Sequence, residues 1–288
     1  MKNDEMITLA KFLAISGIIL PMLPHKNLIP DINLTPYSIW LATVVVSGIS
    51  YLSYLLKRYV FHESGTLVSG IIGGLYSSTA TISVLARKSR KASEQEATDY
   101  VAAMLLAVSM MFLRFMILIL IFSREIFLSI YPYLLTMAVV AAIVAWFIHS
   151  RQKRPEGQSA ETEEDDSSNP LEFKVALIFA VLFVIFTFLT HYTLVYAGTG
   201  GLNLLSFVSG FSDITPFILN LLQNTGSVAA LIITACSMQA IISNIMVNMF
   251  YALFFAGKGS KLRPWILGGF GVVIVCNLVL LLFLSLMH

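Results

Sequence analysis

Long apolar runs constrain this chain more than any other feature of its sequence. Seven of them have roughly the 17–25 residues that a helix needs to cross about 30 Å of hydrocarbon. They lie at about 6–23, 36–57, 100–122, 127–149, 171–196, 227–255 and 265–287. Charged residues make up 12% of the chain, whereas a soluble domain carries about 25%. The sequence therefore predicts an all-α polytopic membrane protein whose first partner is the lipid bilayer.

Two further apolar stretches, 66–87 and 203–222, are interrupted halfway by small and polar residues. The first contains the string Gly-Gly-Leu-Tyr-Ser-Ser-Thr-Ala-Thr at 73–81, and the second contains Gly-Phe-Ser-Asp-Ile-Thr-Pro at 210–216. Irregular backbone at membrane depth is tolerated only where it is buried in protein or lines a wet cavity. Interrupted segments at corresponding positions of two halves are the best sequence indication of a transporter's binding site.

The order of the elements predicts two repeats, 36–149 and 171–288, which follow an extra N-terminal helix and loop at 1–35. An offset of 136 residues aligns the interrupted stretch of one repeat with that of the other. Between the repeats, 150–170 is rich in Ser, Glu and Asp. Such a composition cannot bury a core, so this segment is predicted to be a flexible acidic linker.

Basic residues distinguish two topologies, because Lys and Arg in short loops favour the cytoplasmic side. If both interrupted stretches are re-entrant, all the basic clusters fall on one side, the N-terminus is cytoplasmic and the C-terminus is outside. Each repeat then crosses the membrane three times, so the repeats are inverted, as in many secondary transporters. The alternative is nine full spans, with basic clusters on both sides. The clusters stand at 57–58, 87–91, 151–154 and 258–263.

Hydroxyl and carboxylate side chains at both interruptions are typical of helix N-caps. Ser77, Ser78 and Thr79 stand at the first interruption, and the offset of 136 places Asp213 on Ser77 and Thr215 on Thr79. Two capped N-termini would bring two positive dipole ends together near the membrane midplane, where an anionic group or a polar pocket fits. The other interpretation is a seam of small residues that packs helices together.

Two ionisable residues stand deep in apolar runs, where burying a charge is costly. Asp213 could bind a cation, carry a proton or only cap a helix, and it is the predicted ligand if a metal binds. Arg114 needs a carboxylate, carbonyl or anionic partner, and we predict that it pairs with Asp213. In the second repeat Asn244 and Asn248 share a helical face, and on an offset of 134 Asn248 takes the place of Arg114. Such amides either line a polar path or hold helices together.

No pattern of an enzyme or of a nucleic-acid-binding protein stands out. The sequence shows no Ser/His/Asp set, paired carboxylates, phosphate-binding loop or zinc spacing, and no basic cluster interleaved with aromatics. Cys236 and Cys276 both lie in apolar runs and are interpreted as core hydrophobes. We therefore expect no enzymatic activity, no cofactor and no nucleic-acid partner. A homo-oligomer is compatible with the sequence.

The string Gly-Gly-Leu-Tyr-Ser-Ser-Thr-Ala at 73–80, followed by Leu-Ala-Arg-Lys-Ser-Arg at 85–90, resembles the signature of a membrane domain often fused behind an MgtC/SapB domain. The Arg114 helix and the turn around Asp213 also match. The resemblance implies a bacterial or archaeal inner-membrane transporter, here in a stand-alone form, linked to Mg²⁺ or other ion homeostasis. That family usually carries two acidic residues in the second turn and a basic residue where Asn248 stands. The missing charges weigh against a divalent-cation site, which needs several oxygen ligands.

The leading hypothesis is an integral membrane transporter or channel-like permease for a small ion or solute, with its site between the two interruptions. The alternative is a non-transporting scaffold or regulator that binds a partner protein or lipid. A hydrated cavity at the interruptions would favour transport, whereas a dry, tightly packed seam would favour the scaffold. The residues predicted to line the site are Ser77, Ser78, Thr79, Arg114, Asp213, Thr215 and Asn244.

Overall fold

Helices account for most of the backbone that the structure describes. The computed structural model describes residues 3–30, 32–60, 65–90, 92, 94–151, 173–223, 228–257 and 260–286. The elements are α1 (Asn3–Met22), α2 (Pro36–Leu55), the π-helix η1 (Leu56–Val60), α3 (Thr66–Lys88), α4 (Glu94–Phe122), α5 (Arg124–Ser150), α6 (Phe173–Ser209), α7 (Ile214–Gln223), α8 (Ala230–Ala256) and α9 (Arg263–Leu286). Within these ranges the only β structure is an isolated bridge between Ile29 and Ile32, so the predicted all-α class is confirmed. The predicted acidic linker falls almost wholly outside the described residues.

Seven helices are long and apolar enough to cross a membrane. They are Pro36–Tyr59, Thr66–Lys88, Glu96–Phe122, Arg124–Ser150, Ala176–Ser209, Ala230–Ala256 and Arg263–Leu284. Six of them coincide with runs predicted to cross, which confirms a multi-pass membrane protein. The seventh, Thr66–Lys88, is one of the interrupted stretches. The predicted first span corresponds to α1, whose apolar part, Ala10–Met22, is shorter than the seven.

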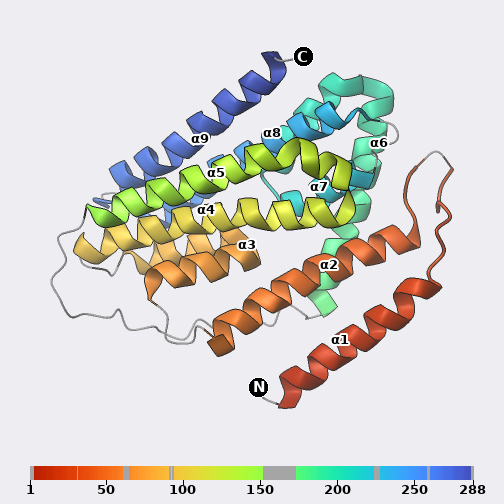
Figure 1. Ribbon diagram of the computed structural model, residues 1–288, viewed down its shortest axis with the longest axis horizontal. Helices are drawn as coiled ribbons and strands as arrows, with labels where there is room; N and C mark the ends of the chain where they lie inside the picture. Colours follow the sequence, from red (N-terminus) through yellow and green to blue (C-terminus); the bar gives the residue numbers. More distant parts are fainter. Residues whose placement is uncertain are drawn as a thin grey trace.

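Helix α3 is broken at Ser77 and turns back on itself. Ser77 has extended backbone angles (φ −159°, ψ 109°) within an otherwise helical segment. A Cβ added to Gly73 would lie 2.5 Å from the Thr81 hydroxyl oxygen, whereas residues eight apart in a straight helix are separated by about 12 Å. Consistently, α3 extends only partway along α4 in Figure 1. The first stretch is therefore a re-entrant hairpin, as predicted, and nine full spans do not fit.

The second interrupted stretch begins with a reversal of direction inside α6. Gly198 has φ 59° and ψ −151°, a left-handed conformation that strains any other residue. The chain turns back there so sharply that a Cβ on Gly201 would lie 2.8 Å from Thr193 Cγ2, and the bend is visible at one end of α6 in Figure 1. Residues 199–209 then form a first half-helix, and α7 forms the second.

In both halves the first half-helix packs on the next long helix in the same register. A Cβ on Gly74 would lie 2.5 Å from the Ala107 Cα, and a Cβ on Gly210 would lie 2.4 Å from the Ser243 Cβ. Each partner stands 33 residues after its glycine. The offset of 136 therefore extends from the interruptions into α4 and α8.

A second pair of contacts, one turn earlier, repeats this register. A Cβ on Gly70 would lie 2.3 Å from the Ala103 carbonyl oxygen. At the equivalent place in the second half, the Ser206 hydroxyl donates to Gln239 Oε1 at 3.0 Å, again 33 residues apart. In the first half the contact is between the Gly70 position and the α4 backbone, and in the second half it is a hydrogen bond between side chains. The helices nevertheless meet at the same positions.

The two halves run in opposite directions. The start of α4 lies beside the end of α8, because Arg90 donates to the Phe254 carbonyl at 3.2 Å. The start of α9 lies beside the end of α5, where a Cβ on Gly269 would lie 3.1 Å from Ile148 Cδ1. In Figure 1, α4 leads from the end it shares with α3 towards α7, whereas α8 leads from α7 back to the end where α9 begins. The turns that carry Arg90 and Lys261 thus share one end of the molecule, as the inverted arrangement predicts.

Candidate functional site

Arg114 is the side chain that relates the two breaks to each other. Its Nη1 donates a hydrogen bond of 2.8 Å to the carbonyl oxygen of Tyr76, the residue before the break in α3. Asp213, at the other break, attracts the same guanidinium electrostatically. The buried Nε of Arg114 has no hydrogen-bond partner in the described part of the chain. A half-buried cation thus stands between the breaks, and its buried Nε–H is unpaired among the described residues.

The predicted direct ion pair between Arg114 and Asp213 is not formed. The Asp213 carboxylate instead accepts the backbone N–H of Thr215 at 2.9 Å. Local capping holds the carboxylate, while the long arginine reaches a carbonyl on α3, so the two charges attract each other only at longer range.

Ser77 and Asp213 occupy equivalent capping positions, as their alignment predicts. The Ser77 hydroxyl accepts the N–H of Ala80 at 3.4 Å, and the Asp213 carboxylate accepts the N–H of Thr215 at 2.9 Å. The first distance is longer than a usual N–H···O bond, whereas the second lies at its optimum. Each cap ties the start of the second half-helix to the break, and the carboxylate does so with the better geometry.

The remaining predicted residues differ in burial. Ser78, Thr215 and Asn244 are buried, with 8%, 2% and 5% of their surface exposed. Ser77 and Thr79 are half-buried, and the Thr79 carbonyl accepts the Ser83 hydroxyl at 2.8 Å. Asp213 is exposed. Ser77, Arg114 and Asp213 therefore keep exposed surface around the breaks. The buried residues Ser78, Thr215 and Asn244 take part in the packing between helices.

Asn244 makes a related contact in the second half, from a long helix to a backbone carbonyl before the break. Its Nδ2 donates to the Gly210 carbonyl at 3.2 Å, at the end of the first half-helix. Asn248 supports it by donating from Nδ2 to the Asn244 Oδ1 at 3.1 Å. By the offset of 136, Gly210 corresponds to Gly74 and not to Tyr76. Arg114 and Asn244 therefore bind carbonyls at different positions before the breaks. The alignment of Asn248 with Arg114 stays a prediction.

Sequence reasoning missed a polar contact beside α7. Asn220 is fully buried and its Nδ2 donates to the Thr187 hydroxyl on α6 at 2.7 Å. On the next turn of α6, the buried Thr190 hydroxyl has no partner among the described residues. The available signal was a lone asparagine within the apolar stretch 217–222, which a search for charged residues does not detect.

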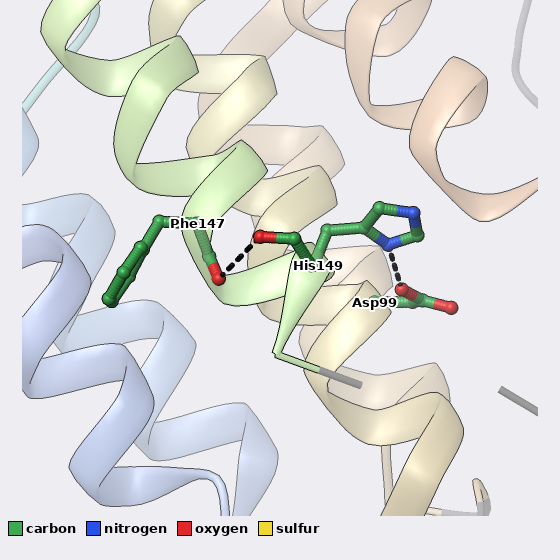
Figure 2. Close-up of polar contacts among 4 residues, drawn as sticks. Asp99, Phe147 and His149 are labelled. Atoms are coloured by element: carbon green, nitrogen blue, oxygen red, sulfur yellow. Dashed lines mark hydrogen bonds and ion pairs between the residues drawn. The ribbon is translucent and has the colours of Figure 1, made fainter. Parts of the chain in front are cut away.

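His149 lies at the end of α5, far from the breaks. Figure 2 shows its ring directed at Asp99 near the start of α4, with 2.6 Å between Nδ1 and Oδ1. This contact ties the two helices together at the end that carries Arg90. Within the described ranges, no three His, Cys, Asp or Glu side chains gather in a way that could hold a metal ion.

These features define a multi-pass helical membrane protein in which each of two inverted halves contributes a broken helix. Residues 44–256 match the family described as Domain of unknown function (DUF4010), and the chain belongs to that family. The match spans both breaks. An uncharacterized protein of Aquifex aeolicus (strain VF5) is 25% identical over 227 residues, which cover 77% of this chain and 96% of that protein. No solved structure matches the chain. Neither the family description nor the relative's name mentions an MgtC or SapB domain.

Proposed function

We propose that this protein is a transporter or channel-like permease for a small ion or solute, with its site around Arg114 between the two breaks. The observation that carries the proposal is the environment of this arginine. It bonds a carbonyl at one break, attracts the carboxylate at the other, and keeps a buried Nε–H without a partner. Ionisable residues within membrane spans are rare and mark substrate or ion pathways.

The charges at the breaks suit a solute with an anionic group. The half-helix capped by Ser77 and the helix capped by Asp213 both begin at the breaks, and helix N-termini carry partial positive charge. Arg114 adds a full positive charge. Asp213 is then the group that would accept a coupling cation or a proton.

We further propose that the protein lies in the cytoplasmic membrane, with its N-terminus inside and its C-terminus outside. The supporting feature is the gathering of basic turns, those of Arg90 and Lys261, at one end of the bundle. A role in Mg²⁺ or other ion homeostasis rests only on the resemblance to the domain associated with MgtC/SapB. Mg²⁺ accordingly belongs among the first solutes to be tested.

The test is uptake into liposomes that contain the purified protein. Na⁺, K⁺, Mg²⁺, chloride, phosphate and small carboxylates are offered in turn, and any active solute is retested with Arg114→Gln and Asp213→Asn. We expect each variant to lower uptake at least tenfold while remaining folded. Arg124→Gln, at an exposed position at the start of α5, is the matched control and should retain uptake. The proposal would be overturned if the protein neither bound nor took up any of these solutes and the variants changed only its thermal stability.

A second candidate function is a non-transporting scaffold that binds a partner protein or lipid. The observation in its favour is the close packing of the breaks on the long helices. At Gly70 and Gly74 the backbone of α3 approaches α4 so closely that no side chain fits. A scaffold would show no uptake of any solute, and its Arg114 variants would change stability alone.

A further inference from the structure

A polar hollow lies away from the breaks, at the basic end of the molecule. It has a volume of about 380 Å³ and opens between the α3–α4 turn and the α8–α9 turn. Its lining includes two cations, Arg90 and Lys261, and the hydroxyl residues Thr98 and Ser260. No carboxylate is among the described residues that line it. Pockets for small ligands typically measure about 300–1,000 Å³, so the space suits a compact anionic group.

Arg90 is held in place at this hollow by the neighbouring half of the molecule. It donates to the Phe254 carbonyl at the end of α8 at 3.2 Å. Its Nε would lie 3.4 Å from a Cβ at Gly257, whose φ of 93° favours glycine. An arginine has five N–H donors in a planar fork that matches the oxygens of a phosphate. Anchoring through one of them orients the fork before any ligand arrives.

Two helix starts contribute to the same hollow. Ala97 and Thr98 belong to the beginning of α4, and Trp265 belongs to the first turn of α9. Ser260 prepares the start of α9, because its hydroxyl accepts the N–H of Leu262 at 3.2 Å. The partial positive charge of helix N-termini adds to that of the two cations. The described lining therefore receives positive charge from both halves of the chain, while Glu96 of the first turn of α4 stands outside that lining.

We propose that this hollow binds a phosphate group, carried either by the headgroup of an anionic phospholipid or by a free phosphate. Its position supports both sources: the hollow lies at the end of the spans, and Trp265 is of the residue type that settles at headgroup level. Basic residues are also expected at a cytoplasmic face simply because they set the orientation of a membrane protein. The distinguishing feature is an anchored arginine and a lysine around one cavity. This site does not depend on the proposed transport function.

Two binding measurements on the purified full chain separate the sources of phosphate. In the first, native mass spectrometry compares retention of phosphatidylglycerol and phosphatidylcholine. In the second, thermal unfolding in detergent is followed as inorganic phosphate replaces chloride at constant ionic strength. Binding of phosphatidylglycerol alone assigns a lipid, and stabilisation by inorganic phosphate assigns a free anion. Failure of both probes would overturn the proposal.

The variants Arg90→Gln and Lys261→Gln test whether binding occurs at this hollow. Each should weaken binding of the active probe about fivefold, the effect of one basic residue near an anionic surface. Arg151→Gln is the control, because Arg151 lies at the same end but stacks on Phe147 at 4.4 Å. It should change binding less than twofold. Equal losses in all three variants would reduce the effect to general surface charge and refute the site. If Arg90→Gln impairs folding because the bond to Phe254 is lost, the binding measured for Lys261→Gln tests the site alone.

Discussion

The two breaks perform the same structural task with different chemistry. At the first, a hydroxyl caps the second half-helix through a long bond, and an arginine from α4 holds the preceding carbonyl. At the second, a carboxylate caps α7 through a short bond, and an amide from α8 holds the carbonyl. The carboxylate of Asp213 in the second half thus has its opposite charge, Arg114, in the first half. The two halves therefore share a framework, but their ionisable groups differ.

The halves also differ in how their half-helices approach the long helices. Around Gly74 the neighbouring atoms belong to the backbone of Ala107, whereas around Gly210 the nearest atoms belong to the Ser243 side chain. The Ala107 backbone cannot move aside without shifting a whole helix, whereas at Gly210 the Ser243 hydroxyl can rotate away even though the Ser243 Cβ is fixed to its own backbone. We therefore expect the first half to tolerate less change than the second.

The largest effect is expected from adding a methyl group at these glycines. Gly74→Ala should lower the free energy of unfolding by about 2–3 kcal/mol, within the range for overpacking, and Gly210→Ala by about 1–2 kcal/mol. Thermal unfolding in detergent measures both. Gly268→Ala, where nothing lies within 4 Å of the added Cβ, should be neutral or slightly stabilising. A larger loss for Gly210→Ala than for Gly74→Ala would reverse the expected order of the halves.

Removing the amide of Asn244 should have the next largest effect on stability. Asn244→Leu leaves the Gly210 carbonyl and the Asn248 amide without their partners. An unsatisfied buried polar group costs about 1–3 kcal/mol. Chemical unfolding should show this loss, whereas Asn203→Leu, at an exposed position on the half-helix before Gly210, should cost less. Unchanged stability in Asn244→Leu would mean that water can replace the amide at this break.

The two caps should differ in the same experiment. Asp213→Ala removes a well-formed N-cap, which is typically worth about 1 kcal/mol. Ser77→Ala removes a bond of 3.4 Å, so we expect about half that loss or less. The double variant tests whether the breaks are coupled, since distant sites add within about 0.5 kcal/mol. A larger loss for Ser77→Ala would show that the hydroxyl has a role beyond the cap.

The smallest effect is expected outside the breaks, at the pair in Figure 2. Asp99→Asn removes the charged partner of His149, and both side chains are partly exposed, at 30% and 21%. Surface ion pairs contribute about 0–1 kcal/mol and weaken with salt. Thermal unfolding at low and high salt should therefore show a small difference that shrinks at high salt. A loss as large as that of Asn244→Leu would place an essential contact at this end.

Much of the fold is predictable from local patterns in the chain. Apolar runs longer than the hydrocarbon thickness specify the spans, and the run of small and hydroxyl residues around Ser77 specifies the first break. The pairing of Ser77 with Asp213 as caps also follows from their spacing. The bend at Gly198 lies in the glycine-rich stretch Gly-Thr-Gly-Gly at 198–201, and glycine adopts the left-handed conformation without strain. Each span, break and bend depends on residues close together in sequence, and the pairing of Ser77 with Asp213 only compares two such local patterns.

The partners of the polar side chains depend instead on how helices meet. Close contacts at glycines set the register between α3 and α4 and between the half-helix and α8. That register determines which carbonyl a given side chain can reach. It brings Arg114 to Tyr76 rather than to Asp213, and Asn244 rather than Asn248 to Gly210. Spacing along the chain cannot supply these pairs, since a shift of one helical turn between neighbours moves every contact by about 5.4 Å.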